Sequence, residues 1–97
     1  IMISQEQIDI IINTLKPFNP EKIGVFGSYS RGDNGKDSDI DILYQFKDTI
    51  GLFSLIKLKG ELEKKLNKRV DLLSEKYIHP RLKSNIMRDL KLIYEQN

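Results

Sequence analysis

Apolar residues recur at the spacing of an α-helix in three parts of the chain. The first follows Ser4, and Gln7 three residues later completes the pattern of a capping box, which marks a helix start. The second spans residues 50–68, and its apolar positions near helical spacing are Phe53, Ile56, Leu58, Leu62 and Leu66. The third spans residues 79–90, with Pro80 in its first turn, where proline is tolerated. The pattern therefore predicts three helices.

The segments between these helices are short and rich in β-branched and apolar residues, as strands are. They are residues 22–28, 39–46 and 69–74. Residues 91–95 can extend the last helix or form a short final strand, and we favour the strand. The order α-β-β-α-β-α-β predicts an α+β fold, in which helices pack on at least one face of a mixed α/β sheet. A chain of 97 residues is expected to form one domain, over residues 2–97.

Composition excludes several classes of protein. A net charge of +2, with both signs alternating along the chain, argues against a nucleic-acid-binding surface. No stretch approaches the roughly 18 apolar residues of a membrane span, and the N-terminus lacks the layout of a signal peptide. The absence of cysteine excludes disulfides and thiolate metal sites. We therefore expect a cytoplasmic protein that has no membrane segment.

Two carboxylates interrupt the predicted strand at 39–46. Because side chains alternate along a strand, Asp39 and Asp41 leave the same face, opposite to the apolar face. Two ionised carboxylates held together repel unless a cation neutralises them, and oxygen ligands favour Mg²⁺ or Mn²⁺ over zinc. Asp71 is likewise out of phase with the apolar face of its own strand. If the two strands are neighbours, three carboxylates converge and could hold two metal ions for a phosphoryl displacement.

The turn after the first predicted strand offers groups that suit a phosphate. Gly27 permits close approach of the backbone, whose N–H groups can face the anion, and the Ser28 hydroxyl can add a hydrogen bond. Arg31 carries a planar, permanently charged guanidinium group that can bind the phosphates of a nucleoside triphosphate at this turn. Each feature alone is more often an ordinary turn or a solvated charge. Their joint order, with Gly-Ser, ten residues and then Asp-x-Asp inside an apolar segment, indicates a catalytic site.

The segment GSYSRGDNGKDSDIDI, residues 27–42, resembles the Gly-Ser-x10-Asp-x-Asp signature of the DNA polymerase β-like nucleotidyltransferase superfamily. Within that superfamily the chain resembles the minimal nucleotidyltransferases, which include the antitoxins paired with HEPN ribonuclease toxins. The likeness extends from Lys22 to about Glu95 and includes the segments RVDLLSE and IMRDLKLIYE. It implies the polymerase β-like core for the predicted α+β fold.

The resemblance also implies roles for individual residues. It implies that Gly27 and Ser28 hold the triphosphate of ATP, and Arg31 matches a position where relatives often carry a basic residue. The positions it implies for two Mg²⁺ ions and for catalysis are Asp39, Asp41 and Asp71. Since all three acidic positions are filled, the resemblance argues against an inactive copy.

The activity implied is Mg²⁺-dependent transfer of AMP from ATP to a hydroxyl, with release of pyrophosphate. In the antitoxin branch the acceptor is a tyrosine of the HEPN toxin, whose adenylylation silences the ribonuclease. A chain this short has no extra domain to hold the acceptor, so a partner chain or a second copy across an oligomer interface must present it. Two alternatives stay open: a non-catalytic module that neutralises a toxin by binding, and a nucleotidyltransferase that acts on a small molecule. The acceptor, the nucleotide preference and the oligomeric state are left open as well.

Two further features receive structural interpretations. His79, the only histidine, precedes Pro80 at a predicted helix start, and we interpret it as a capping or surface residue. Basic residues also accumulate in and after the second predicted helix, at Lys57, Lys59, Lys64, Lys65, Lys68 and Arg69. We interpret these as the solvated face of an amphipathic helix, with a docking surface for an acidic partner or RNA as the alternative.

Overall fold

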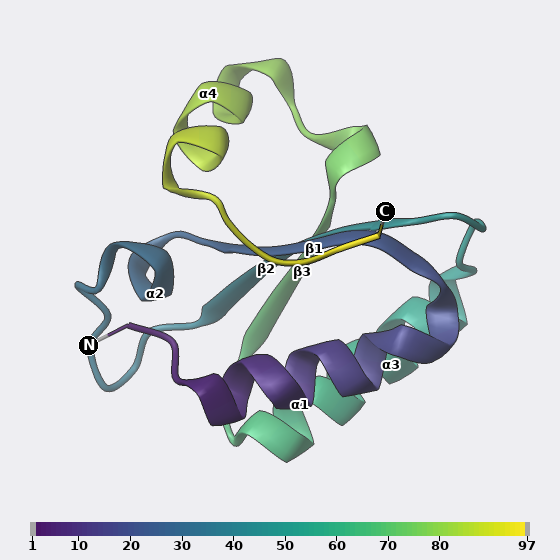
Figure 1. The fold of residues 1–97 in the computed structure, drawn as a ribbon, viewed down its shortest axis with the longest axis horizontal. Coiled ribbons are helices and arrows are strands. Elements are labelled where there is room, and N and C mark those ends of the chain that lie inside the picture. Colours follow the sequence, from purple (N-terminus) through teal and green to yellow (C-terminus); the bar gives the residue numbers. More distant parts are fainter. Residues whose placement is uncertain (1, 97) are drawn as a thin grey trace.

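The computed structural model describes residues 2–96. Its centre is a mixed four-stranded sheet in the order β3-β2-β1-β4 (Figure 1). The strands are β1 (Pro20–Phe26), β2 (Ile40–Phe46), β3 (Val70–Ser74) and β4 (Lys91–Glu95). β1 pairs antiparallel with both β2 and β4, whereas β2 and β3 run parallel. A parallel pair needs a crossover connection, which the helix between β2 and β3 supplies.

Helices cover both faces of this sheet. The α-helices are α1 (Gln5–Leu15), α2 (Ser28–Arg31), α3 (Leu52–Leu66) and α4 (Pro80–Asp89), and short 3₁₀ turns occupy Lys16–Phe18 and Glu75–Tyr77. α1 and α3 lie side by side on one face, and α4 lies on the other (Figure 1). Among residues 2–96, no helix combines the length and apolar character that crossing a bilayer requires.

The apolar core lies between the sheet and the pair α1 and α3. Along β2, Ile40, Ile42 and Tyr44 are buried in this core, so the alternation predicted for the strand is confirmed. The helices contribute the buried residues Ile11, Leu15, Leu58, Leu62 and Leu66. Burying a side chain of this size stabilises the fold by about 1.5–3 kcal/mol. This face of the sheet is therefore the main source of stability.

Most of the predicted elements are confirmed, and one was missed. Residues 91–95 form a strand, and Ser4 and Gln7 cap α1 through two reciprocal hydrogen bonds, of 3.1 Å to the Ser4 Oγ and 2.9 Å to the Gln7 Oε1. His79 is the N-cap of α4, where its Nδ1 accepts a hydrogen bond from the Arg81 N–H. The missed element is α2, a single helical turn that begins directly after Gly27, where only a turn was predicted.

The apolar positions of α3 are divided between two sides of the helix. Leu58 and Leu62 are buried against the sheet, and Leu55 packs beside them. Phe53 and Ile56 instead point outward, with 87% and 58% of their surface exposed. The reason is geometric, because a helix advances 100° per residue and only one side of it can face the sheet. Near-helical spacing alone did not decide which apolar residues belong to the core.

Candidate active site

Parallel pairing of β2 and β3 places two of the predicted acids side by side. Asp41 lies directly across from Asp71 in the strand register, and both leave the sheet on the face opposite to α1 and α3. Asp71 is close enough to Asp41 to add to the effect of burial in raising the pKa of the Asp41 carboxyl. Ionising both groups would place two negative charges side by side, which is unfavourable unless a cation balances them.

The surroundings of Asp41 disfavour its negative charge. Burial, the hydrogen bond to Asp71 and the charges of Asp71 and Asp39 together raise the pKa of Asp41 to about 6, with burial the largest cause. The positive charge of Arg31 opposes the shift, so the guanidinium lies within electrostatic range of the carboxyl. The site thus holds more negative charge than its surroundings balance, which is a condition that a divalent cation relieves.

Asp39 lies at the start of the same strand but has a different partner. Its Oδ1 forms an ion pair of 3.2 Å with the Nε of Arg69, the residue that precedes β3. Within residues 2–96, no group of three or more acidic, histidine or cysteine side chains has the geometry to hold a metal ion. The structure therefore brings Asp41 and Asp71 together, and it leaves Asp39 nearby in an ion pair with a basic residue.

The ligand atoms that these residues offer are nevertheless of the type that Mg²⁺ prefers. Asp41 and Asp71 offer only carboxylate oxygens, the ligand type that hard divalent cations prefer. Burial and the charges of Asp71 and Asp39 raise the pKa of Asp41, so a divalent cation that balanced those charges would favour the deprotonated ligands that metal binding requires. Asp39 could become a third ligand only if its ion pair with Arg69 opened. Because Arg69 is exposed, breaking this ion pair should cost little free energy.

The turn at Gly27 closes one side of this acidic site. Gly27 has φ of 72° and ψ of −152°, a backbone conformation that side-chain-bearing residues rarely adopt. A methyl group added at Gly27 would overlap the Asp41 carboxylate, so the backbone of the turn lies directly against that acid. Ser28 then begins α2, whose first N–H groups have no partner within their own helix. The predicted phosphate turn and two of the predicted metal ligands are thus neighbours.

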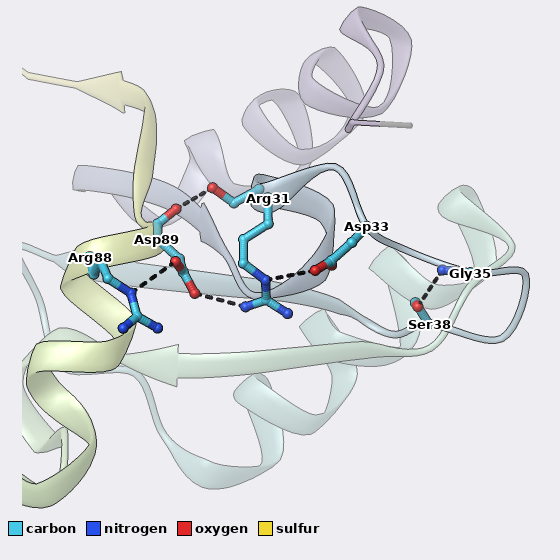
Figure 2. Close-up of polar contacts among 7 residues, drawn as sticks. Arg31, Asp33, Gly35, Ser38, Arg88 and Asp89 are labelled. Carbon is cyan, nitrogen blue, oxygen red and sulfur yellow. Dashed lines mark hydrogen bonds and ion pairs between the residues drawn. The ribbon is translucent and has the colours of Figure 1, made fainter.

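Arg31 lies at the end of α2 and is held by two carboxylates (Figure 2). Its Nη1 is 2.8 Å from the Asp89 Oδ2, and its Nε is 3.1 Å from the Asp33 Oδ2. The Ser30 hydroxyl also donates a hydrogen bond to the Asp89 carbonyl, which ties α2 to the end of α4. The Arg31 guanidinium lowers the pKa of Asp89 by donating a hydrogen bond to its carboxylate. Arg31 is consequently fixed near Asp41 rather than free in solvent.

Sequence reasoning missed Asp89, whose side chain is only 12% exposed. The residue is 58 positions from Arg31, so no local pattern joins them. A weak signal was present in its place at the last residue of a helix, where the helix dipole disfavours a negative charge. A positively charged side chain from another part of the fold can stabilise such an acid, and Arg31 does so here.

A large hollow on the protein lies away from these residues. A cavity of about 890 Å³ is lined by the last residues of β2, by the start of α3 and by residues of the second 3₁₀ turn and α4. None of the six predicted site residues lines it. The candidate active site is instead a charged region around Asp41 and Asp71, on the face of the sheet opposite to α1 and α3.

Comparison with known proteins identifies the family. Residues 6–97 match the family described as polymerase beta, nucleotidyltransferase. The protein adenylyltransferase MntA of Thermococcus cleftensis is 35% identical over 94 residues, which are 92% of this chain and 95% of that protein. The Methanocaldococcus jannaschii protein MJ0435, provisionally named a protein adenylyltransferase, is 42% identical over 79 residues, 81% of this chain and 85% of its own.

Solved structures agree with this result. A toxin–antitoxin crystallised with AMP-PNP superimposes with a TM-score of 0.83 at 27% identity, covering 93% of this chain and 74% of that chain. The complex of a tri-AMPylated Shewanella oneidensis HEPN toxin with an MNT antitoxin gives a TM-score of 0.78 at 25% identity, covering 97% and 74%. This chain therefore belongs to the polymerase β nucleotidyltransferase family and is a nucleotidyltransferase of the minimal type.

Proposed function

We propose that this chain is a Mg²⁺-dependent protein adenylyltransferase that moves AMP from ATP to a tyrosine hydroxyl of a HEPN-type toxin and so acts as its antitoxin. The observation that carries this proposal is the contact between Asp41 and Asp71 directly beside the backbone of Gly27. Acids that hold a metal and a turn that holds a phosphate must be neighbours for phosphoryl transfer. The names of the relatives support the protein substrate and the antitoxin role.

Each proposed site residue has a role in this reaction. Asp41 and Asp71, joined by Asp39, would hold Mg²⁺, which when bound stabilises the charge on the transferring phosphoryl group. Gly27 lets the triphosphate approach the backbone, and the Ser28 hydroxyl donates a hydrogen bond to it. Arg31 supplies positive charge on the same side.

The transfer itself exchanges one bond to phosphorus for another. The acceptor oxygen attacks the α-phosphorus of ATP, the bond to the bridging oxygen breaks, and pyrophosphate leaves. The proton of the acceptor hydroxyl passes to Asp71, which is exposed and can be reached from outside the sheet. Positioning these groups in line accounts for most of the catalysis expected of such a site.

A binding module without catalysis is the second candidate. It is favoured by the ion pair between Asp39 and Arg69, and by the lack of a ready three-ligand metal cluster within residues 2–96. In that case the chain would silence a toxin only by covering it. The two functions differ in whether a covalent bond to AMP forms.

Labelled ATP distinguishes the candidates. The chain would be incubated with α-labelled ATP, Mg²⁺ and a HEPN-type toxin protein, and we expect label on that protein. The double variant Asp39→Asn and Asp41→Asn should abolish the label, whereas Asp37→Asn with Asp48→Asn, two exposed acids outside the site, should leave it unchanged. Label only on a small hydroxylated compound would point to a small-molecule enzyme. If the Asp39 and Asp41 variant protects cells fully, the binding module is the correct function.

A further inference from the structure

The outer side of α3 exposes large apolar side chains that no other part of residues 2–96 covers. Leu52, Phe53 and Ile56 are 69%, 87% and 58% exposed, although α3 is packed beside α1 on its inner side (Figure 1). Phe53 and Ile56 are three residues apart and therefore lie on the same side of the helix. An exposed phenylalanine next to an exposed isoleucine is a feature of contact surfaces rather than of an ordinary solvated helix face.

Gly60 continues this apolar side by one more turn. It lies four residues after Ile56 and seven after Phe53, in the interior of a 15-residue helix. Among residues 2–96, a Cβ atom added at Gly60 would meet no atom within 4 Å, so neither a turn nor a close contact in this part of the chain explains the glycine. Glycine destabilises a helix interior relative to alanine. Its presence there is explained if another backbone approaches α3 at this point, since a missing side chain permits close helix packing.

The charges beside this apolar side indicate the chemistry of the partner. Lys57 and Lys64 follow Phe53 and Gly60 by four residues each and flank the apolar positions on one side. Both are exposed, and neither forms an ion pair within residues 2–96. A surface that places two unpaired lysines along an apolar strip is complementary to a segment with acidic residues beside its own apolar residues.

The surface is continuous with a hollow large enough to extend the contact. Leu52 lines the cavity of about 890 Å³, which is also lined by Tyr77, 73% exposed, and by Lys76 and Lys83. A stable interface buries about 800 Å² on each partner, which is more than three side chains supply. The first turns of α3 and this cavity together offer apolar surface beside lysines, and the cavity lining also includes Asp48 and Glu75.

We propose that the outer α3 face, defined by Phe53, Ile56 and Gly60, docks an amphipathic helix of a partner protein that carries acidic residues beside its apolar stripe. Phe53 is the anchor, Gly60 sets the close approach of the two helices, and Lys57 and Lys64 pair with the acids. Docking at this face requires neither ATP nor the acids of the active site. It goes beyond the proposed transfer reaction, because it assigns the recognition of a protein partner to a different surface.

A second copy of the chain fits this face less well. If two copies crossed antiparallel at Gly60, Lys57 of one copy would approach Lys64 of the other, and like charges would oppose each other. Such juxtaposition disfavours self-association. The charges therefore select a different, acidic protein over a homodimer.

Binding of the full chain to the HEPN-type protein used above tests the proposal. Phe53→Glu should raise the Kd at least about 30-fold, as expected for an anchor residue. The matched control is Leu82→Glu, an apolar residue of α4 with 54% exposure, which should change the Kd less than about twofold. Isothermal titration measures the Kd of both variants. Repeated at two salt concentrations, it should show that the double variant Lys57→Glu and Lys64→Glu has a smaller salt dependence of the Kd.

Gly60 provides a variant whose two effects have opposite signs. Gly60→Leu should raise the Tm of the chain alone by about 4–8 °C, because it removes glycine from a helix interior without a clash. The same variant should weaken binding at least about tenfold, because its side chain occupies the space of the partner. A more stable chain that binds more weakly cannot be explained by misfolding.

Several outcomes would overturn the proposal. It fails if the Phe53 and Gly60 variants bind like the unchanged chain, if the chain does not bind the HEPN-type protein, or if sedimentation shows a homodimer that Phe53→Glu dissociates. The transfer reaction is judged separately. Transfer of label by a chain whose binding ignores Phe53 would refute the docking face alone, and Phe53-dependent binding without label would refute the adenylyltransferase alone.

Discussion

The two faces of the sheet differ although the same strands build both. Ile42 and Asp41 are consecutive in β2, yet Ile42 is fully buried under α1 and α3 while Asp41 points to the other face, beside Asp71 and Gly27. On the first face, burial removes apolar surface from water and stabilises the fold. On the second face, burial raises the pKa of a carboxyl and gathers negative charge. Stability and chemistry are thus divided by the pleat of one strand.

The largest expected effect is on the acidic face alone. Asp41→Asn should lower adenylyl transfer by about 10³-fold or more, because it removes a charge that the metal requires. The free energy of unfolding measured in urea at pH 8 should stay equal or rise, since the variant removes a repulsive charge. A clear loss of stability in this variant would show that the two faces are not separate.

The next largest effect belongs to the apolar face. Ile42→Ala should lower the free energy of unfolding by about 3 kcal/mol, through lost burial and the cavity left behind. The measurement is the urea midpoint with an unchanged slope. The specific activity of the fraction that remains folded should stay near that of the unchanged chain. Loss of activity in fully folded Ile42→Ala would mean that the core also sets the site geometry.

A substitution at Gly27 should lower both the stability of the fold and the transfer activity. Gly27→Ala should destabilise the fold by roughly 1–3 kcal/mol, because of its positive φ and because the new methyl group overlaps the Asp41 carboxylate. Transfer activity should fall too, as the turn moves away from the acids. The control is Gly35→Ala, in an exposed loop where the nearest atom is 4.0 Å from the new Cβ atom. Equal melting temperatures of the two variants would argue against the close contact of Gly27 with Asp41.

The acidic face should also respond to pH. With its pKa raised to about 6, Asp41 binds a proton more tightly in the folded state than in the unfolded chain. This contribution to stability is therefore full below the ordinary aspartate pKa and is lost as the pH rises through about 6. Mg²⁺ competes with the same proton, so the rise in Tm on adding Mg²⁺ should be larger at pH 8 than at pH 5. Asp41→Asn should remove this difference, and a Mg²⁺ effect independent of pH would contradict it.

The smallest effect is expected where α4 holds Arg31. Asp89→Asn keeps the shape of the side chain and removes its charge, so Arg31 becomes less firmly placed near Asp41. We expect a several-fold higher KM for ATP, a nearly unchanged kcat and little change in stability. The matched variant is Asp33→Asn, which removes the other and more exposed partner of Arg31. Identical kinetics in both variants would mean that Asp89 has no special part in placing Arg31.

Prediction from sequence succeeded wherever the deciding forces are local. The cap at Ser4, the alternation along β2 and the strand at 91–95 depend on neighbours within a few residues, and the structure shows all three. It failed for α2, because a single turn of helix after Gly27 lacks the length that gives a periodic pattern. It also left open which apolar residues of α3 face inward, since that depends on how the helix packs.

The chain by itself determined the order of its elements, the placement of Asp39 and Asp41 on one face, and the family signature around Gly27. Only the tertiary structure decided that Asp71 pairs with Asp41, that Arg69 holds Asp39, and that Arg31 meets Asp89 from the far end of the chain. Local pattern follows from backbone geometry and side-chain polarity, which each residue carries with it. Contacts between distant residues follow from the pairing of strands and the packing of helices, which exist only after the chain has folded.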